Sequence, residues 1–560
     1  MNPASVVRRR RSRTFDAVRA VFANHDLRHV ELAYLLFIAA RWGARLAILV
    51  FAFERGGAPE TGLAAVIQLV PAAVVAPLAS TVGDRIRRDR ALLIGFAVQT
   101  AAAGGTAAAL LWSFPIAVVY ALTAVMAASM TITRPVVSAM FPQLARSPDE
   151  LIAANVVAGS IHGAMVLVGP AVAGVLLGLG GAGLALAVFA GLLLGATLLS
   201  VGLEAHPLPA SSSPRPVSEA AAGFRAVARH SDQRLVVGLL VGQSVIAGAL
   251  DVLIVVIVLG LFGLPSSAAG YLSAARGAGG LLGGLWAFSL IGKPRLAAAM
   301  ALGLVVFGFG TAALALAVVA ALAAAFLVVV GSGYARADIA GRTLLLRVVP
   351  DEILTRVFGV LEGMNMAGLA AGGALAPLLV AALGVRSGTL VAGLLLPATV
   401  LILSPRIRAL DRAVRIPEQE LSILRSVDLF APLANPMMEA VASRLRHVEV
   451  PPGAVIMRKG EPGNRFYVIA DGEVEVTRDG RPVARLGPGA YFGEIALLRD
   501  VPRTATVTAT TPTTLLVLER ADFLEAVTGH PVAREAADVT IRERLPKGID
   551  TSSEEGRPGP

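Results

Sequence analysis

Apolar segments of membrane-spanning length recur along the chain from Val30 to Leu403. A helix of about 20 apolar residues is long enough to cross the hydrocarbon layer of a bilayer. With 55% hydrophobic and 16% charged residues, the chain also has too few polar side chains to cover a water-soluble surface. The sequence therefore predicts an all-α, multi-pass membrane domain over residues 30–404, with about twelve transmembrane helices. The expected spans are 30–53, 62–83, 91–112, 115–138, 152–178, 183–203, 235–261, 267–291, 295–315, 317–340, 355–383 and 387–404.

Basic residues gather on one side of these predicted spans. They lie in the basic amphipathic N-terminal segment 1–29 and in the connections 84–90, 206–234, 293–295 and 342–356. Loops rich in Arg and Lys stay in the cytosol, so we expect a protein of the cell (inner) membrane with both termini cytosolic. The net charge of +10 comes from this arginine pattern, and for that reason we expect no nucleic-acid partner. The lack of cysteine excludes disulfides and thiolate metal sites.

The membrane domain carries the same signals twice, in the same order. The longest hydrophilic stretch, 205–234, is rich in Pro and Ser as linkers are, and it separates residues 30–204 from 235–404. The shared signals are an arginine, a proline, an acidic pair and a second proline, at Arg134, Pro142, Asp149-Glu150 and Pro170 and again at Arg342, Pro350, Asp351-Glu352 and Pro377. Several matches in one order indicate a duplicated six-helix unit.

This six-plus-six arrangement resembles the major facilitator superfamily over about residues 15–404. The family motif between spans two and three is represented by Ser80, Asp84-Arg85 and Arg87-Arg88, with Ser80 and Arg87 where the family has glycine. The stretch 169–174, Gly-Pro-Ala-Val-Ala-Gly, is similar to the family's antiporter motif, a closely packed and kinkable helix. The stretch 134–155 is similar to the macrolide-efflux and siderophore-exporter branch. The resemblance implies a transporter and favours export over import. Because Asp84 and Arg85 lie in a loop at the membrane edge, we expect them to form a conformational latch at the cytosolic mouth rather than to contact substrate.

Charged residues stand inside several predicted spans. A charge in mid-bilayer is costly unless it faces water or a partner, so Arg41 and Arg45, four residues apart on one helical face, should point inward. The resemblance implies that spans one, four, seven and ten line a central cavity, which would bring together Arg41, Arg45, Gln243, Asp251 and Arg336. We hypothesise that Asp251 takes up and releases a proton as access alternates. The alternative is a static ion pair that holds the two halves together.

A different kind of domain begins after a charged connector at residues 405–428. Short alternating segments between glycine-containing turns are typical of an antiparallel β-roll. We expect strands at 454–458, 466–470, 473–478, 483–486, 505–510 and 514–518, flanked by helices at 436–446, 521–527 and 532–545. The predicted soluble domain therefore occupies residues 429–545, and we expect the polar tail 546–560 to be disordered.

The most specific motif of the chain lies in this roll. It reads Phe-Gly-Glu-Ile-Ala-Leu-Leu from residue 492, Arg-Asp-Val-Pro from 499 and Arg-Thr-Ala-Thr-Val from 503. It resembles the phosphate-binding cassette of cyclic-nucleotide-binding domains. The resemblance implies a site made of Gly493, Glu494, Ile495, Ala496, Arg503, Thr504 and Ala505.

The residue types fit a cyclic nucleotide. Gly493 removes a side chain where the ligand approaches the backbone, and Glu494 offers a carboxylate to the ribose 2′-hydroxyl. The next two amides would face the cyclic phosphate, and Arg503 suits two phosphate oxygens with its donor fork. Thr504 and the Ala505 amide would complete the ring of contacts. As the non-covalent ligand we favour cyclic AMP over cyclic GMP, and the alternative is a roll that has lost its ligand.

The two parts predict a secondary active exporter of drug-like or small metabolite substrates by proton antiport, regulated by cyclic nucleotide. The expected partners are the membrane, the nucleotide, a small-molecule substrate and protons. Nucleotide would order the helices after Ala521 and thereby move the connector. The alternative is a membrane-anchored cyclic-nucleotide receptor whose transporter-like fold does not transport, and a channel is disfavoured because no filter loop is visible. We expect no enzyme, no metal site and no covalent cofactor, since the common catalytic motifs are missing from the sequence and the histidines are scattered.

Overall fold

The computed structural model describes residues 19, 21–85, 87–203, 216–287, 295–413 and 418–528, the last range with gaps at 428, 431–432, 434–437, 439–440 and 443. Within these ranges the side chains at 76–85, 148–149, 216–221, 287, 351–352, 413, 418–419 and 528 are not described. The chain forms two compact units, residues 1–414 and 415–560, and the described residues of each build their own apolar core.

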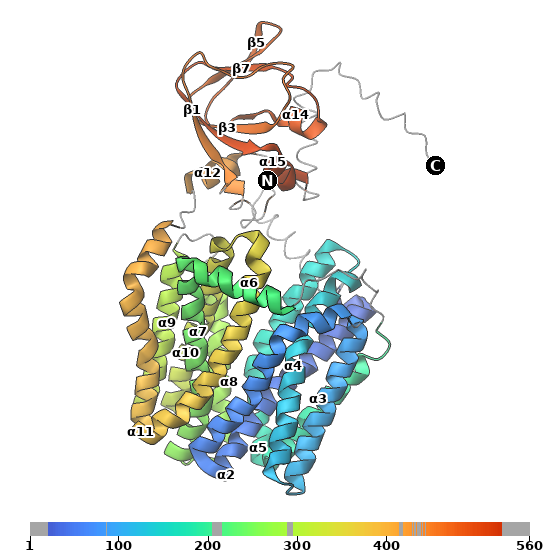
Figure 1. Ribbon diagram of the computed structural model, residues 1–560, viewed down its shortest axis with the longest axis vertical. Coiled ribbons are helices and arrows are strands. Elements are labelled where there is room, and N and C mark those ends of the chain that lie inside the picture. The colour runs from blue at the N-terminus through green and yellow to red at the C-terminus, as the bar shows by residue number, and fades with distance from the viewer. Residues whose placement is uncertain are drawn as a thin grey trace. The chain divides into compact units, whose positions relative to one another are not determined.

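The first half of the membrane unit is built from long helices (Figure 1). They are α2 His25–Arg85, α3 Arg88–Leu111, α4 Ile116–Leu144 and α5 Pro148–Leu199. Two of them are interrupted by a glycine pair, at Gly56-Gly57 in α2 and at Gly180-Gly181 in α5. The second glycine of each pair has a left-handed φ, 64° and 69°, which other residues adopt only with strain. Each helix is therefore two arms joined at a kink, and the predicted spans 30–53 and 62–83 lie on the two arms of α2.

The second half follows the linker helix α6 Pro216–Arg229. Its elements are α7 Ser231–Val255, the π-helical turn η1 Val256–Leu261, α8 Ser267–Ala287, α9 Leu296–Ala313, the 3₁₀ turn η3 Leu314–Leu316, α10 Ala320–Val348 and α11 Asp351–Ala413. As in α5, the last helix is kinked at a glycine, Gly384, with φ 79°. The kink separates the predicted spans 355–383 and 387–404. The two halves differ at their start, since α2 is one kinked helix while α7 and α8 are separate helices with η1 between them; the duplication stays a prediction.

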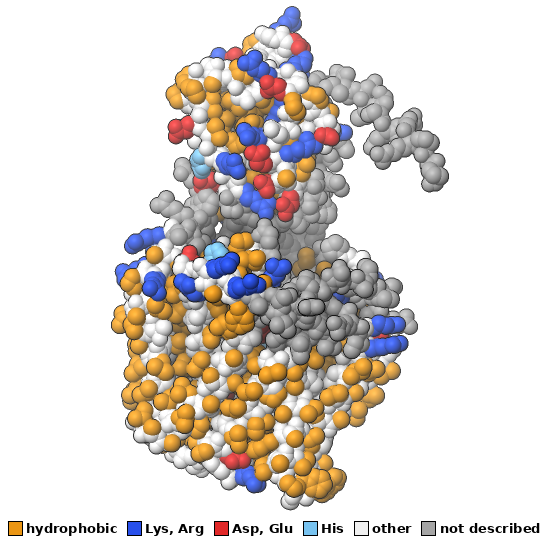
Figure 2. Space-filling view, viewed as in Figure 1, with side chains coloured by type: hydrophobic (Ala, Val, Ile, Leu, Met, Phe, Trp, Pro, Cys, Tyr) orange, Lys and Arg blue, Asp and Glu red, His pale blue; other side chains and the backbone are white. Residues whose placement is uncertain are grey.

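The helices of this unit have the length and composition of membrane spans. Eight of the described helices are long and apolar enough to cross a membrane. In Figure 2 apolar side chains cover most of the visible face of the unit, and basic side chains gather where α6 lies, which carries the exposed Arg225 and Arg229. The structure confirms the polytopic helical domain. The total of about twelve spans stays a prediction, because it counts each arm of α2, α5 and α11 separately.

Small residues hold the two halves close together. Helix α5 packs on α8, and α2 packs on α11. A Cβ atom added to Gly174 would lie 2.7 Å from the carbonyl oxygen of Ser267, and one added to Gly62 would lie 2.5 Å from Cγ of Pro377. The prediction of close packing around 169–174 is confirmed for the glycine that faces α8, since only a residue without a side chain fits there.

The C-terminal unit contains two antiparallel sheets of four strands. The strands are β1 Arg446–Val450, β2 Val455–Met457, β3 Arg465–Asp471, β4 Val474–Arg478, β5 Arg481–Leu486, β6 Tyr491–Phe492, β7 Thr506–Ala509 and β8 Thr513–Glu519. Their order is β1-β8-β3-β6 in one sheet and β2-β7-β4-β5 in the other. The described helices are α12 Glu418–Ser426, α14 Glu494–Arg499 and α15 Arg520–Thr528. The predicted antiparallel roll is confirmed.

Two features of this unit differ from the sequence prediction. Strands β1 and β6 were not predicted, and Arg446, expected to end a helix, instead begins β1 opposite Val517 of β8. Pairing with a strand about 70 residues away decides this, and no local signal carries such pairing. Residues 436–437, 439–440 and 443 of the predicted helix 436–446 and all of 532–545 and 546–560 lie outside the described residues, whereas 438, 441–442 and 444 are helical.

The predicted connector is divided between the two units. Helix α11 continues through 405–413 as an extension of the membrane unit, and the boundary follows at residue 414. Helix α12 instead buries Leu421 and Leu424 in the core of the C-terminal unit, together with Phe430, Phe466 and Phe523. The second part of the connector is therefore a structural element of the roll.

Candidate functional site

The predicted nucleotide motif forms the turn between β6 and α14. Gly493 has φ 93°, and a Cβ atom there would lie 2.6 Å from Nη1 of Arg503 and 3.1 Å from the carbonyl oxygen of Arg465. Glycine is thus required at this position by the backbone conformation and by the close approach of the guanidinium. Glu494 follows as the first residue of α14 and is 3% exposed.

Arg503 reaches back across this turn. Its Nη1 donates to the carbonyl oxygen of Gly493 at 3.0 Å and its Nη2 to that of Arg465 at 2.7 Å. Its Cζ lies 5.7 Å from the ring centre of Tyr467. Burial lowers the pKa of the Arg503 guanidinium, because desolvation disfavours its charged form, while Tyr467 and Glu494 act in the opposite direction. A buried cation held by neutral carbonyls is well placed to receive an anion.

The other predicted residues of this site surround the same turn. Ala496 and Ala505 are buried, and Ile495 and Thr504 are half-buried. Gly463, in the loop before β3, lies against the same site. A Cβ atom at Gly463 would lie 2.6 Å from Cβ of Ala496 and 3.6 Å from Cζ of Arg503, so this glycine lets the β2–β3 loop close over the site. A glycine that neither has a positive φ nor lies in the motif gives no local signal of such a role.

The membrane unit encloses a cavity of about 1540 Å³ between its two halves. Its described lining comes from α2, α4 and α5 of the first half and from α7 to α11 of the second, and Phe224 adds a side chain from the linker helix α6. The volume exceeds the range of about 300–1,000 Å³ that is usual for small-molecule pockets. Both halves therefore contribute directly to one chamber.

Asp251 of α7 lies in this cavity between two arginines. Nη2 of Arg45 on α2 donates to Oδ2 of Asp251 at 2.6 Å, and Nη1 of Arg276 on α8 donates to Oδ1 at 2.6 Å. The side chain of Asp251 is 10% exposed and those of both arginines are 20% exposed. The carboxylate thus joins the first half of the unit to the second through a short, mostly buried ion pair.

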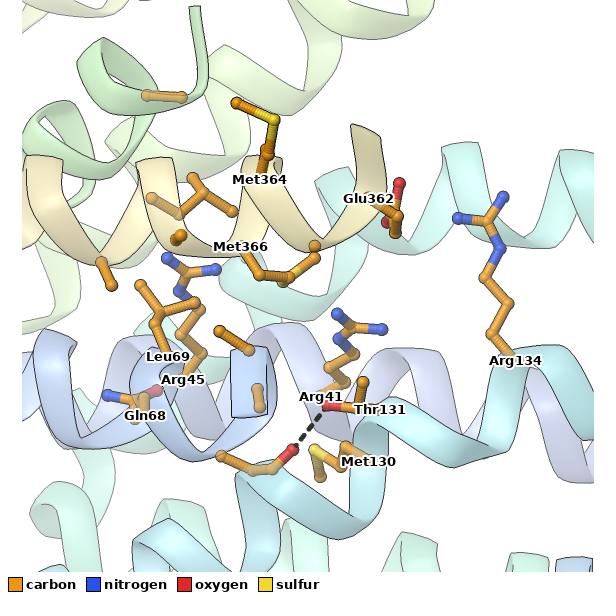
Figure 3. A pocket seen from close by; sticks show the side chains of 18 of the residues that line it. Arg41, Arg45, Gln68, Leu69, Met130, Thr131, Arg134, Glu362, Met364 and Met366 are labelled. Carbon is orange, nitrogen blue, oxygen red and sulfur yellow. Dashed lines mark hydrogen bonds between the residues drawn. The ribbon is translucent and has the colours of Figure 1, made fainter. Parts of the chain in front are cut away.

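Further charged groups line the cavity on α2, α4, α10 and α11 (Figure 3). Arg41 and Arg45 project from α2 toward α11, where Glu362, Met364 and Met366 lie. On the second half, Arg342 contacts Asp338 at 3.0 Å and Glu362 at 3.4 Å. For Arg41, by contrast, the described residues offer no hydrogen bond or ion pair.

Not every residue predicted to face the lumen does so. Arg41, Arg45 and Asp251 line the cavity, but Gln243 and Arg336 are absent from its described lining. Nε2 of Gln243 donates to the carbonyl oxygen of Tyr334 at 2.9 Å, which ties α7 to α10. The guanidinium of Arg336 stacks 3.5 Å above the ring of Trp286.

Four other residues complete this comparison. The side chains of Asp84 and Arg85, the predicted latch, lie outside the described residues. His162 lines the cavity with its ring edge-on to Trp42, at 6.5 Å between centres. Arg276, which the sequence analysis left out of the cavity, is the second partner of Asp251.

The membrane unit is polytopic and helical, and charged residues line the chamber between its halves. The separate roll has a buried arginine at a Gly-Glu turn. Together these features define a membrane protein with a ligand-binding domain. The family model of the Major Facilitator Superfamily matches residues 30–335. The chain belongs to this superfamily. The family model of the cyclic nucleotide-binding domain matches residues 447–530, and the C-terminal unit is a domain of that kind.

Two curated relatives match about a fifth of this chain. A cyclic nucleotide-gated potassium channel of Mesorhizobium japonicum is 42% identical over 122 residues, which cover 22% of this chain and 34% of the channel. A cAMP-dependent protein kinase regulatory subunit of Dictyostelium discoideum is 41% identical over 113 residues, covering 19% of this chain and 33% of that protein. The chain thus spans about a third of the length of these relatives.

Among solved structures, a catabolite activator protein of Thermus thermophilus is 32% identical, with 21% of this chain and 58% of that chain covered and a TM-score of 0.20. The regulatory subunit of a cAMP-independent protein kinase A of Trypanosoma brucei, a mutant bound to cAMP in its A site, is 28% identical, with 22% of this chain and 46% of that chain covered and a TM-score of 0.21.

Proposed function

We propose that this protein is a secondary active transporter of the inner membrane whose activity is regulated by a cyclic nucleotide, with both termini in the cytosol. The observation that carries the proposal is the cavity of about 1540 Å³ that both halves of the membrane unit line. A chamber between two related halves can open to either side when one half tilts against the other. The glycine contacts of α5 with α8 and of α2 with α11 provide closely packed surfaces for such a movement.

The ion pair at Asp251 is the proposed coupling site. Because Arg45 lies on the first half and Asp251 and Arg276 on the second, tilting of the halves must change at least one of these contacts. A proton can occupy the carboxylate only where a guanidinium withdraws from it, so proton uptake and the movement of the halves would be linked. With this linkage we propose proton antiport, and with it export of drug-like or small metabolite substrates.

Flux measurements test the coupling role. Drug efflux from inverted membrane vesicles should depend on an imposed pH gradient for the wild type and lose this dependence in Asp251→Asn. Unchanged pH dependence in Asp251→Asn would leave Asp251 as a static ion pair and refute proton coupling at this residue.

The nucleotide is proposed to bind at the turn of Gly493 and Glu494. The carboxylate of Glu494 would accept a hydrogen bond from the ribose 2′-hydroxyl. Arg503 would exchange its hydrogen bonds to two carbonyl oxygens for hydrogen bonds to the phosphate. The amides of Ile495 and Ala496 and the hydroxyl of Thr504 would supply further contacts. Similarity to a cAMP-dependent kinase regulatory subunit supports cyclic AMP as the ligand.

The core of the C-terminal unit offers a route from this site to the membrane unit along the chain. Leu497 of α14 and Phe523 of α15 lie in the same apolar cluster as Leu424 of α12. Nucleotide that shifts α14 or α15 must therefore repack α12, which follows α11 in the sequence. Coupling of this kind is typically worth about 1–3 kcal/mol, so nucleotide should change transport several-fold.

One comparison tests the whole proposal. Cells with and without the gene, with and without added cyclic AMP, are compared for growth in a panel of drugs and metabolites. Gene-dependent resistance that changes several-fold with cyclic AMP supports a regulated exporter. Nucleotide binding by the full-length protein without any gene-dependent flux would favour the alternative, a membrane-anchored cyclic-nucleotide receptor.

A further inference from the structure

The charge of the membrane cavity is strongly unbalanced. Its described lining holds three carboxylates, on Asp251, Asp338 and Glu362, against six arginines. These arginines are Arg41, Arg45, Arg134, Arg276, Arg342 and Arg356. With His162 neutral, the described lining carries a net charge of +3. Walls of low dielectric strengthen the attraction of such a chamber for an anion.

The imbalance is greatest in the middle of the helices. Arg41, Arg45 and Arg276 lie there, and the carboxylate of Asp251 contacts Arg45 and Arg276. Arg41 stands one helical turn from Arg45, where like charges repel, and it has no hydrogen bond or ion pair to another described residue. An uncompensated arginine at membrane depth is costly unless water or a ligand solvates it. A bound anion would supply this missing partner.

Each carboxylate of the described lining already contacts an arginine. Asp251 is held by two guanidiniums at 2.6 Å, and Arg342 contacts both Asp338 and Glu362. A cationic substrate would have to displace an arginine and also overcome the net positive charge of the lining. The chamber is therefore suited to the opposite charge.

The rest of the lining is apolar and adaptable. Met126, Met130, Met364 and Met366 contribute flexible thioethers, and Phe307 adds an aromatic ring. Methionine side chains adjust to ligands of different shapes. A small inorganic anion would leave most of the volume of about 1540 Å³ unfilled. The apolar surface favours a ligand with a hydrocarbon or aromatic body.

We propose that the cavity binds an amphipathic organic anion, with its acidic group at Arg41 and its apolar body against the methionines. This inference rests on the proposed transport function and names the class of substrate. It replaces the broad class of drug-like compounds by carboxylates, sulfonates or phosphates that carry an apolar group.

Equilibrium binding to the full-length protein tests the class of ligand. The probes are carboxyfluorescein, an anion, and a cationic rhodamine ester with the same xanthene ring. Fluorescence anisotropy in neutral detergent should show saturable binding of the anion at least about ten-fold tighter than of the cation, weakening as salt is added. Equal or tighter binding of the cation, or no saturable binding of the anion, overturns the proposal without recourse to any variant.

Variants then locate the acidic group. Arg41→Gln should weaken binding of the anion by about ten-fold or more, since a charge-assisted contact is lost, and Arg41→Lys should weaken it less. Arg408→Gln, at an exposed arginine outside the described cavity lining, is the matched control and should leave affinity unchanged. Equal affinities of Arg41→Gln and Arg408→Gln overturn the assignment of Arg41.

Flux of the same dyes in vesicles separates this inference from the proposed function. Binding of the anion without flux contradicts transport and leaves the class of ligand standing. Flux of the cation without binding of the anion supports transport and overturns the class of ligand.

Discussion

Replacing Asp251 by asparagine removes the carboxylate that joins Arg45 of the first half to Arg276 of the second. The amide keeps the size of the side chain but has no charge to offer to the two guanidiniums. Both arginines stay in a position where each side chain is only 20% exposed. The variant therefore tests the contribution of one carboxylate to the junction of the two halves.

The structure sets the size of the expected effect. Each of the two contacts, at 2.6 Å, is a charge-assisted hydrogen bond, and such bonds contribute about 1.5–3 kcal/mol each. Water in the cavity hydrates part of each arginine, which places the loss at the lower end, about 3 kcal/mol. At about 2.1 cal/mol/K of unfolding entropy per residue, a unit of this length should melt about 3–4 °C lower.

Asp338→Asn is the matched control in the same cavity. Asp338 and Arg342 form a pair four residues apart on α10, their side chains are 30% and 36% exposed, and Arg342 keeps Glu362 as a partner. A pair of this kind contributes about 0.3–1 kcal/mol. Thermal melting of the purified full-length protein in detergent, followed by tryptophan fluorescence, compares the two variants under identical conditions.

A second substitution makes the test specific for charge. Arg276→Gln in the Asp251→Asn background removes one of the two uncompensated guanidiniums and should recover part of the lost stability. Equal melting temperatures of Asp251→Asn and Asp338→Asn, or no recovery in the double variant, would refute the reasoning. The junction of the halves would then not depend on this ion pair.

Three further predictions concern close packing and the nucleotide site. Gly174→Ala places a methyl group 2.7 Å from a backbone oxygen of α8 and should lower both the melting temperature and the flux. Gly191→Ala on the same helix meets nothing within 4 Å and should be neutral. Equal behaviour of the two variants would contradict a tight junction between α5 and α8. Arg503→Ala should weaken cyclic AMP binding to the full-length protein about 10- to 100-fold by isothermal titration calorimetry, and undiminished affinity would remove Arg503 from the site. In Gly493→Ala, at φ 93°, the new Cβ atom would lie 2.6 Å from the Arg503 guanidinium, so this variant should weaken binding in the same assay. In Gly487→Ala the new Cβ atom meets nothing within 4 Å, so this variant should bind as the wild type does. Equal loss of affinity in both variants would argue against a specific role of Gly493.

The proximity of Gly493, Glu494 and Arg503 was predictable in large part, because these residues are close in sequence. They lie within residues 493–503, so their arrangement depends on short-range geometry that a motif can specify. Gly463 and the carbonyl of Arg465 were missed, since they come from another part of the roll. Their role depends on the pairing of β3 with β6, which no local pattern expresses.

The arrangement of charges in the membrane was only partly predictable. Arg41, Arg45 and Asp251 do line the cavity, but Arg276 was missed, and Gln243 and Arg336 are absent from the described lining. Hydropathy identifies a membrane helix, yet a helix that is apolar all round gives a weak signal of which side faces its neighbours. The rotation of each helix about its axis, which decides which side chains face the cavity, is therefore set by packing in the tertiary structure.

By itself, the sequence determined which part of this protein lies in a bilayer, which part is a roll, and the order of the elements in each. Apolar runs of fixed length require a bilayer, and alternating segments with glycine turns require a roll, because both follow from local chemistry. Only the tertiary structure decided which distant charges meet. Arg45 and Asp251 are 206 residues apart, and it is the packing of α2 against the second half that places them at 2.6 Å and leaves Arg41 without a carboxylate partner among the described residues.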